Sequence, residues 1–196
     1  MRIVGGKWKG RHLTSPGQGR VRPTAEHVRD AWLSALAEEL KGARVLDLFA
    51  GTGALGLEAL SRGARYVDFV ENGPASLHAL KANVAALRVR EKTRIFKRDA
   101  LPFAAALPPG VYDVAFADPP YESRMLDRLI ESWKAVPFAR VLTVEHAESH
   151  PLPPGGQRRV MEAGTAVTTY RARASVAAGV PAPDSDPDPQ PPTPGE

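Results

Sequence analysis

Apolar residues in this chain gather in short runs that are separated by longer stretches rich in Ala and Leu. The runs are apolar on both faces, which is typical of parallel strands covered on both sides, while the stretches between them have the length and composition of helices. The alternation predicts an α/β fold with a doubly wound sheet and ligand sites at the carboxyl ends of its strands. The predicted strands are residues 45–49, 66–71, 94–99, 111–117 and 140–145, and the predicted helices are residues 54–61, 75–87 and 123–133.

The two ends of this pattern differ from its middle. Residues 157–162 and 167–174 alternate between apolar and polar around Ala-Gly-Thr-Ala, which predicts an antiparallel hairpin that completes a seven-stranded sheet. Residues 2–14 read as an irregular or hairpin extension, and the first helix is expected to begin near Thr24, whose hydroxyl can cap it. We therefore divide the chain into a basic extension (1–23), one domain (24–176) and a disordered tail rich in Pro and Asp (177–196).

Length and composition limit the possible functions. The chain has 196 residues, 43% of them hydrophobic, which is enough for one compact core. It has no cysteine, so disulfides, thiolate metal sites and a Cys nucleophile are excluded. We find no secretory signal and no run long enough to span a membrane, so a cytoplasmic protein is expected. The oligomeric state is left open, with a monomer favoured.

The net charge of +4 is unevenly distributed. Seven Lys and Arg residues lie within residues 1–29, against the single acid Glu26. Such a basic head can bind a phosphate backbone, although a solvated charged terminus has the same composition. Trp8, which could stack on a base, favours nucleic acid. Deleting residues 1–20 is accordingly expected to weaken RNA binding and to spare cofactor binding.

A glycine turn follows the first predicted strand. Residues 51–56 read Gly-Thr-Gly-Ala-Leu-Gly, which satisfies G-x-G-x-x-G between a strand and a helix. Glycines there let a ligand approach the backbone closely, and Glu71, at the end of the next strand, can accept hydrogen bonds from ribose hydroxyls. The pattern fits a nicotinamide cofactor and S-adenosylmethionine equally well, and a tight turn without a ligand stays possible. A P-loop is excluded, because no Lys-Ser or Lys-Thr follows the glycines.

A second motif ends the fourth predicted strand, where the sequence reads Asp118-Pro119-Pro120-Tyr121. An exocyclic amine of a base is a poor nucleophile, so a catalyst must orient it and accept hydrogen bonds from its protons. Asp118 and the carbonyl of Pro119 can do both, the two prolines stiffen the turn, and Tyr121 offers a ring for stacking of an extruded base. We predict these four residues to be catalytic; the alternative is ordinary turn punctuation between a strand and a helix.

The residues before the glycine turn narrow the choice of cofactor. Asp47 and the run Leu-Phe-Ala-Gly-Thr-Gly that follows it resemble the first motif of class I S-adenosylmethionine-dependent methyltransferases. The generic motif has a glycine where this chain has Phe49, and phenylalanine there is typical of the branch that methylates exocyclic amines. By this resemblance, the motif holds the methionine end, the acid ending the second strand holds the ribose, and the acid after the third strand lies near the adenine. The implied cofactor-binding residues are Asp47, Phe49, Gly51, Gly53, Glu71, Asp99 and Ala100.

The resemblance extends over most of the chain. MRIVGGKWKGRHL, RPTAEHVRDAWLSAL, VLDLFAGTGALGLEALSRGA and DPPY together closely resemble the bacterial 16S rRNA guanine-N2 methyltransferases, up to about residue 175. This implies S-adenosylmethionine as the methyl donor and a guanine of 16S rRNA, in the small ribosomal subunit or an assembly intermediate, as the acceptor. The basic head would then bind RNA through Trp8, Lys9, Arg22 and Arg29.

Three other functions stay open from the residues alone. The motif of residues 118–121, here called the acceptor clamp, also fits adenine N6 on DNA or RNA. The glycine turn also fits a nicotinamide-dependent oxidoreductase. The basic head alone would suffice for a non-catalytic RNA-binding module. No metal site is expected. His146 and His150 have the spacing of a metal motif, but they follow a strand and run into prolines, whereas a zinc motif of that spacing needs a helix.

Overall fold

The computed structural model describes residues 1–15, 25–119, 124–162 and 164–173. Within them lies a seven-stranded sheet in the order β3-β2-β1-β4-β5-β7-β6. The strands from β3 to β5 are parallel, whereas β7 runs antiparallel to both β5 and β6, so the predicted doubly wound sheet with a closing hairpin is confirmed. The strands are β1 (Arg44–Leu48), β2 (Tyr66–Glu71), β3 (Thr93–Lys97), β4 (Tyr112–Ala117), β5 (Ala139–Ala147), β6 (Gln157–Val160) and β7 (Thr165–Arg171).

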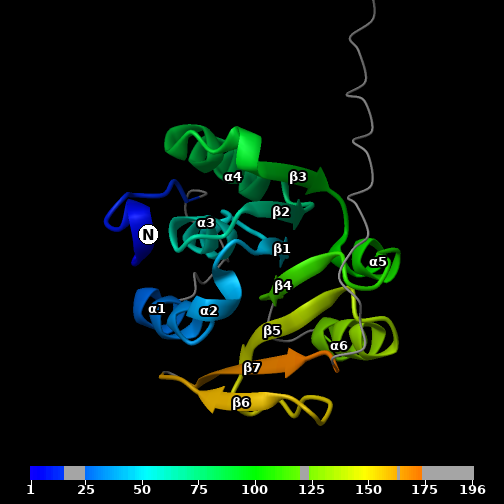
Figure 1. Cartoon of the computed structure of the whole chain (residues 1–196). Helices are drawn as coiled ribbons and strands as arrows, with labels where there is room; N and C mark the ends of the chain where they lie inside the picture. Colours follow the sequence, from blue (N-terminus) through cyan, green and yellow to red (C-terminus); the bar gives the residue numbers. More distant parts are fainter. Residues whose placement is uncertain (16–24, 120–123, 163, 174–196) are drawn as a thin grey trace, which may run out of the picture.

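Helices cover both faces of the sheet, as Figure 1 shows. One face carries α1 to α4 over a cluster that includes Trp32, Leu57 and Phe69, and the other carries α5 and α6 over a cluster that includes Leu46 and Leu142. No helix in the described part is long and apolar enough to cross a membrane. The helices are α1 (Glu26–Ser34), α2 (Ala37–Leu40), α3 (Ala54–Ser61), α4 (Pro74–Leu87), α5 (Ala100–Ala105) and α6 (Met125–Ala135), with short 3-10 turns η1 (Gly6–Trp8) and η2 (Arg90–Lys92).

The start of α1 corrects one prediction. The N-cap is Ala25, which makes no side-chain capping bond, and Thr24, the predicted cap, lies outside the described residues. Glu26, in the first turn, instead accepts hydrogen bonds from the backbone N–H of Arg2 at 3.2 Å and from its Nε at 2.9 Å. The first turn of α1 is therefore bonded to the amino-terminal segment through Glu26.

The amino-terminal segment forms the expected hairpin but is not a separate unit. Arg2 and His12 form an antiparallel bridge, and the N–H of Leu13 donates to the carbonyl of Met1 at 3.0 Å. Ile3 is fully buried and Leu13 is 5% exposed, and both belong to the core cluster beneath α1 and α3. Residues 1–15 thus share the core of the main domain.

A buried carboxylate fastens this segment to α3. Glu58 is fully buried, and its two oxygens accept the N–H groups of Val4 at 2.9 Å and Gly5 at 2.6 Å. Arg62 donates to the same carboxylate from one turn further along at 3.1 Å. Gly6 has φ +73°, and a Cβ there would lie 2.0 Å from the carbonyl oxygen of Ser61, so only glycine permits this close approach. The two glycines at positions 5 and 6 therefore serve docking of the head.

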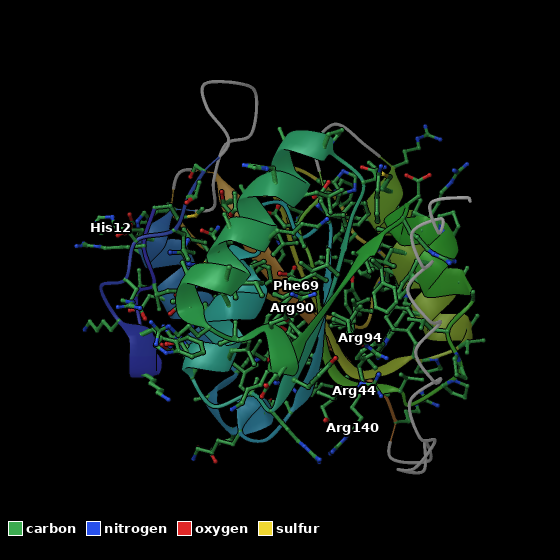
Figure 2. The ribbon with its side chains drawn as sticks, turned by 90° about the horizontal axis from the view of Figure 1, so that it is seen from above. His12, Arg44, Phe69, Arg90, Arg94 and Arg140 are labelled. Atoms are coloured by element: carbon green, nitrogen blue, oxygen red, sulfur yellow. The ribbon has the colours of Figure 1, made fainter. Side chains whose placement is uncertain are left out.

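The amino ends of the strands carry a second set of charges, which neutralise one another. Asp68 is fully buried, and it accepts two bonds from Arg94 at 2.9 Å, one from Arg44 at 3.2 Å and one from the hydroxyl of Tyr112 at 2.8 Å. Figure 2 shows Arg44, Arg94 and Arg140 near one another at this edge. Asp68 thus pairs with Arg44 and Arg94, and Arg140 lies 3.6 Å from Asp113, so we assign this edge a structural role.

Candidate cofactor and acceptor site

The predicted site residues meet at the carboxyl edge of the sheet, around β1 and β4. These two strands are neighbours, and the chain order reverses between them, because β2 follows on one side of β1 and β5 on the other side of β4. Open α/β sheets bind ligands at such a switch point. Leu48 pairs with Ala117, so the glycine turn begins three residues beyond this strand pair and the Asp-Pro-Pro motif one residue beyond it.

The glycine turn leads from β1 into α3 through two left-handed residues. Gly53 is the N-cap of α3 at φ +79°, and a Cβ there would lie 2.3 Å from Cδ1 of Leu80, so no side chain fits. Gly51 has φ +56°, and a Cβ there would meet only the carbonyl oxygen of Phe49, at 4.0 Å. Gly53 is thus required by packing, whereas the missing side chain of Gly51 leaves space into which a ligand can approach.

Phe49 also has a left-handed backbone, with φ +60°. The generic first motif has glycine at this position, and the geometry explains why, since a non-glycine residue there costs about 1–2 kcal/mol. The ring is half-buried against the cluster under α5 and α6, which offsets part of that cost. Such strain occurs preferentially at functional sites, and here it lies next to Asp118 across the strand pair.

Glu71 is oriented by three backbone donors. Its Oε2 accepts the N–H of Gly51 at 2.7 Å, and its Oε1 accepts the N–H groups of Asn72 at 2.9 Å and Gly73 at 2.7 Å. A carboxylate oxygen can accept two hydrogen bonds, so Oε2 keeps acceptor capacity on the side of the glycine turn. That orientation suits an acid that accepts ribose hydroxyls.

Asp47 lies beneath the turn. Its side chain is 1% exposed, and Oδ2 accepts the N–H of Gly56 in α3 at 2.9 Å, which fastens the helix to the end of β1. Burial raises the pKa of Asp47 well above its ordinary value, and the charges of Asp118 and Glu71 raise it further, against the opposing bond from Gly56. The charges of Asp118 and Glu71 therefore act on Asp47, and a cationic ligand at this edge would offset their repulsion. Contact of Asp47 with the methionine end stays a proposal.

Asp99 does not end a strand as predicted. β3 ends at Lys97, and Asp99 is the N-cap of α5, the alternative role of a cap residue, although its side chain makes no capping bond. The side chain is exposed and accepts a hydrogen bond from the Nδ2 of Asn72, the residue after Glu71. Ala100 is 7% exposed and opens α5. Asp99 thus lies beside the end of β2, with Ala100 next to it in the chain, and binding of the adenine by these two residues stays a proposal.

The acceptor clamp is described only in its first half. Asp118 and Pro119 directly follow β4; Asp118 is half-buried and Pro119 is buried. Pro120 and Tyr121 lie outside the described residues, so their predicted roles stay proposals. Asp118 is near enough to Asp47 to affect its pKa, which puts the clamp carboxylate and the cofactor turn in one site.

A pocket of about 360 Å³ lies at the carboxyl end of β5. The segment from His146 to Arg158 lines it, with Thr168 and Tyr170 of β7. Val144 pairs with Ala117, so His146 lies two residues beyond that pair, level with Pro119. Burial lowers the pKa of His146. Its Nδ1 lies 2.9 Å from the carbonyl of Ala147, which can only accept, so Nδ1 carries the proton and Nε2 accepts the hydroxyl of Thr168 at 2.9 Å.

The predicted RNA contacts divide into three cases. Lys9 is exposed, and Trp8 is half-buried against the core with Lys7 Nζ 6.0 Å from its ring centroid. Arg22 lies outside the described residues. The prediction for Arg29 is corrected: its side chain is fully buried, its guanidinium donates to the carbonyl of Arg2, and its Nε lies 3.6 Å from Glu58. Arg29 therefore holds the head onto α3 from inside the protein.

Known proteins place the chain in a family. The family model described as "Conserved hypothetical protein 95" matches residues 1–169. The chain belongs to this family. Among its relatives are "Putative rRNA methyltransferase YlbH" of Bacillus subtilis, 32% identical over 159 residues, and "Ribosomal RNA small subunit methyltransferase D" of Escherichia coli, 38% identical over 130 residues. The first alignment covers 78% of this chain and 86% of the relative, and the second covers 66% and 65%.

Solved structures of the family agree. "Putative methyltransferase yhhF from Escherichia coli" has a TM-score of 0.75 and 31% identity, over 89% of this chain and 99% of that one. A hypothetical protein of Thermus thermophilus has a TM-score of 0.74 and 31% identity, over 88% and 99%. The family resemblance read from the sequence is thereby confirmed, and the fold is that of class I methyltransferases. S-adenosylmethionine, the cofactor that the resemblance implies, is tested next against the residues of the site.

The residues of the carboxyl edge fit this cofactor. The space over Gly51 admits the ligand to the backbone, Glu71 presents an oriented acceptor to a ribose, and the charges of Asp118 and Glu71 favour a ligand that carries an ammonium and a sulfonium. Sequence reasoning missed two buried groups that shape the site, Glu58 and Asn83. Each is a polar residue among the apolar residues of a helix, at a position that periodicity assigns to the core, and that mismatch was the available signal.

Proposed function

We propose that this chain transfers the methyl group of S-adenosylmethionine to the exocyclic N2 amine of a guanine in small-subunit rRNA. The observation that carries the proposal is the position of Asp118 and Pro119 at the end of β4, beside the cofactor turn at the end of β1. The names of the E. coli and B. subtilis relatives, which describe rRNA methyltransferases, support an RNA acceptor. An acceptor within a small-subunit assembly particle also belongs to this proposal.

The residues of the site have distinct tasks in this reaction. S-adenosylmethionine supplies an electrophilic methyl group on a sulfonium. Asp118 and the Pro119 carbonyl accept hydrogen bonds from the two amine protons, which directs the nitrogen lone pair toward the methyl group. As the N–C bond forms and the bond between the methyl group and the sulfur breaks, the sulfur would leave as a neutral thioether and the positive charge would pass to the amine. The carboxylate of Asp118 stabilises that charge and can accept the released proton. Tyr121 and the segment after it are assigned to stacking of the extruded base.

The exposed cations of the head suit an RNA backbone. Lys7, Lys9 and Arg11 lie on a segment that the core holds rigidly, so they present a fixed pattern of charge to phosphates. The pocket at the carboxyl end of β5 has another cation, Arg158, at its wall. We assign it to the RNA next to the target base, because a nucleotide adjoining an extruded base needs room there.

Identification of the methylated nucleoside tests this function. The purified protein is incubated with radiolabelled S-adenosylmethionine and, separately, with naked 16S rRNA, small-subunit particles lacking the modification, and duplex DNA. Digestion of each product to nucleosides should give N2-methylguanosine from RNA or particles only. N6-methyladenosine would replace the guanine assignment with an adenine one, and transfer to duplex DNA would contradict the RNA acceptor.

A further inference from the structure

Asn83 connects two distant parts of the molecule. It lies in α4 and is 1% exposed. Its Oδ1 accepts the N–H of Thr14 at 2.7 Å, and its Nδ2 donates to the carbonyls of Thr14 at 3.0 Å and Thr52 at 3.0 Å. Thr14 ends the amino-terminal hairpin, and Thr52 lies between the two glycines of the cofactor turn. One buried side chain thus joins the head to the turn.

Only an amide suits this position. A carboxylate could accept the N–H of Thr14 but would face two carbonyl oxygens without a proton to donate. An apolar residue of similar size would leave three backbone groups without this partner, and a buried polar group that loses its partner costs about 1–3 kcal/mol. The neighbouring buried positions of α4, Leu80, Val84 and Leu87, are apolar and belong to the core cluster. Packing therefore does not explain why an amide stands at position 83, whereas its bonds to Thr14 and Thr52 do.

The glycine turn needs a hydrogen bond from outside it to fix its conformation. Gly51 and Gly53 flank Thr52, both have left-handed φ values, and glycine restricts the backbone least of all residues. The bond from Asn83 fixes the direction of the Thr52 carbonyl, and with it the orientation of the neighbouring peptide groups that face the cofactor. A change in the direction of the Thr52 carbonyl on cofactor binding would therefore reach Asn83 and, through its two bonds with Thr14, the amino-terminal segment.

We propose that Asn83 is a positioning residue that makes the cofactor turn and the amino-terminal head a single unit, so that cofactor and RNA bind with positive coupling. The RNA half of this statement rests on the proposed function, whereas the cofactor half does not. Coupling between two ligands is reciprocal, so each should raise the affinity for the other by the same factor.

The cofactor half is tested with Asn83→Asp, which keeps the shape and one acceptor. Val84→Ala is the matched control, because it is buried in the same helix and removes only apolar contacts. We expect calorimetry to show an S-adenosylmethionine Kd about tenfold higher for Asn83→Asp, and within about twofold of wild type for Val84→Ala at a similar loss of thermal stability. Wild-type affinity in a folded Asn83→Asp protein would overturn the proposal.

A second variant covers the case in which Asn83→Asp does not fold. Thr14→Pro removes the N–H that donates to Oδ1 and leaves α4 unchanged, at an exposed position. It should also raise the cofactor Kd, although Thr14 is in the head and outside the glycine turn. An unchanged Kd in this variant would show that the head and the turn are independent.

The coupling itself is measured as the Kd for 16S rRNA with and without S-adenosylhomocysteine. In wild type we expect at least about fivefold tighter RNA binding with the ligand, and in Asn83→Asp a ratio near one. Equal ratios in the two proteins would contradict the coupling. Failure of wild type to bind 16S rRNA at all would refute the RNA function, and the Kd for S-adenosylmethionine would still decide the role of Asn83.

Discussion

Two residues just before the glycine turn, Asp47 in β1 and Phe49 after it, have a charge or a conformation that folding alone would disfavour. Phe49 has a left-handed backbone with a β-carbon present, and Asp47 is a carboxylate enclosed at 1% exposure. Both lie at the end of β1, where the cofactor is expected to contact the chain. Stability given up at these positions is consistent with a site that is shaped for its ligand.

At position 49, the left-handed backbone predicts that a glycine variant is more stable than an alanine variant, the reverse of the usual order. Alanine normally stabilises a protein relative to glycine, but at φ +60° it keeps the strain that glycine relieves. Both Phe49→Ala and Phe49→Gly lose the packing of the ring. We expect the free energy of unfolding, from urea denaturation, to be about 1 kcal/mol higher for Phe49→Gly than for Phe49→Ala. The usual order, with alanine more stable, would show that the left-handed conformation is absent in solution.

The pKa of Asp47 predicts a pH dependence of stability. Burial raises the pKa in the folded protein above the ordinary value of 3.8, so the folded state binds the proton more tightly than the unfolded chain. The contribution of Asp47 to the stability of wild type should therefore fall as the pH rises from about 4 through the raised pKa. The amide introduced by Asp47→Asn does not titrate and can still accept the Gly56 N–H, so the stability advantage of this variant should grow over the same range.

Denaturation of both proteins in urea at several pH values, without cofactor, measures this difference. Calorimetry above the raised pKa should show weaker S-adenosylmethionine binding by Asp47→Asn, because the negative charge of the ionised carboxyl is then missing beside the cationic ligand. A stability difference that does not change with pH would mean that the carboxyl of Asp47 is not enclosed as described.

At the scale of elements, hydrophobic periodicity predicted the sheet well and failed where elements are short or interactions are long-range. β2 and α3 have the predicted bounds, because strong apolar runs and glycines delimit them. The helices α2 and α5 were not predicted, since four and six residues are too few for a periodic signal. Arg29 was assigned to RNA because charge suggests exposure, and only the tertiary contact with Glu58 shows otherwise.

The β6–β7 hairpin offers a test of the assigned RNA pocket. Arg158 lines the pocket, whereas Arg159, the next residue of β6, points to the opposite face of the sheet. We expect Arg158→Ala to raise the KM for RNA about fivefold or more without changing the Kd for S-adenosylmethionine, because a phosphate contact is worth about 1 kcal/mol or more. Arg159→Ala is the matched control. Equal effects of the two substitutions would mean that only the general charge of β6 matters.

For the molecule as a whole, the basic head is part of the core, although composition suggested a detachable extension. Removal of residues 1–15 takes away Ile3 and Leu13 and leaves Glu58 without two backbone donors. We expect the free energy of unfolding to fall by about 3 kcal/mol or more, and cofactor binding to weaken with it. This replaces the expectation that a deletion of the head spares the cofactor.

Thermal melts and calorimetry of the truncated protein measure these losses. Deletion of residues 177–196, whose composition predicts disorder, is the matched control and should leave both the melting temperature and the cofactor Kd unchanged. If the head deletion melts like wild type and loses only RNA affinity, the amino-terminal segment would instead be an independent extension.

The central claim is that the end of β4 orients the acceptor amine beside the cofactor turn. The most direct measurement is the single-turnover rate of methyl transfer by Asp118→Ala, with the Kd for S-adenosylmethionine determined on the same preparation. The account predicts a loss of at least about 100-fold in rate with the Kd within a few-fold of wild type, since Asp118 acts on the acceptor. Methyl transfer at the wild-type rate would contradict the account, because the amine would then be oriented by other groups.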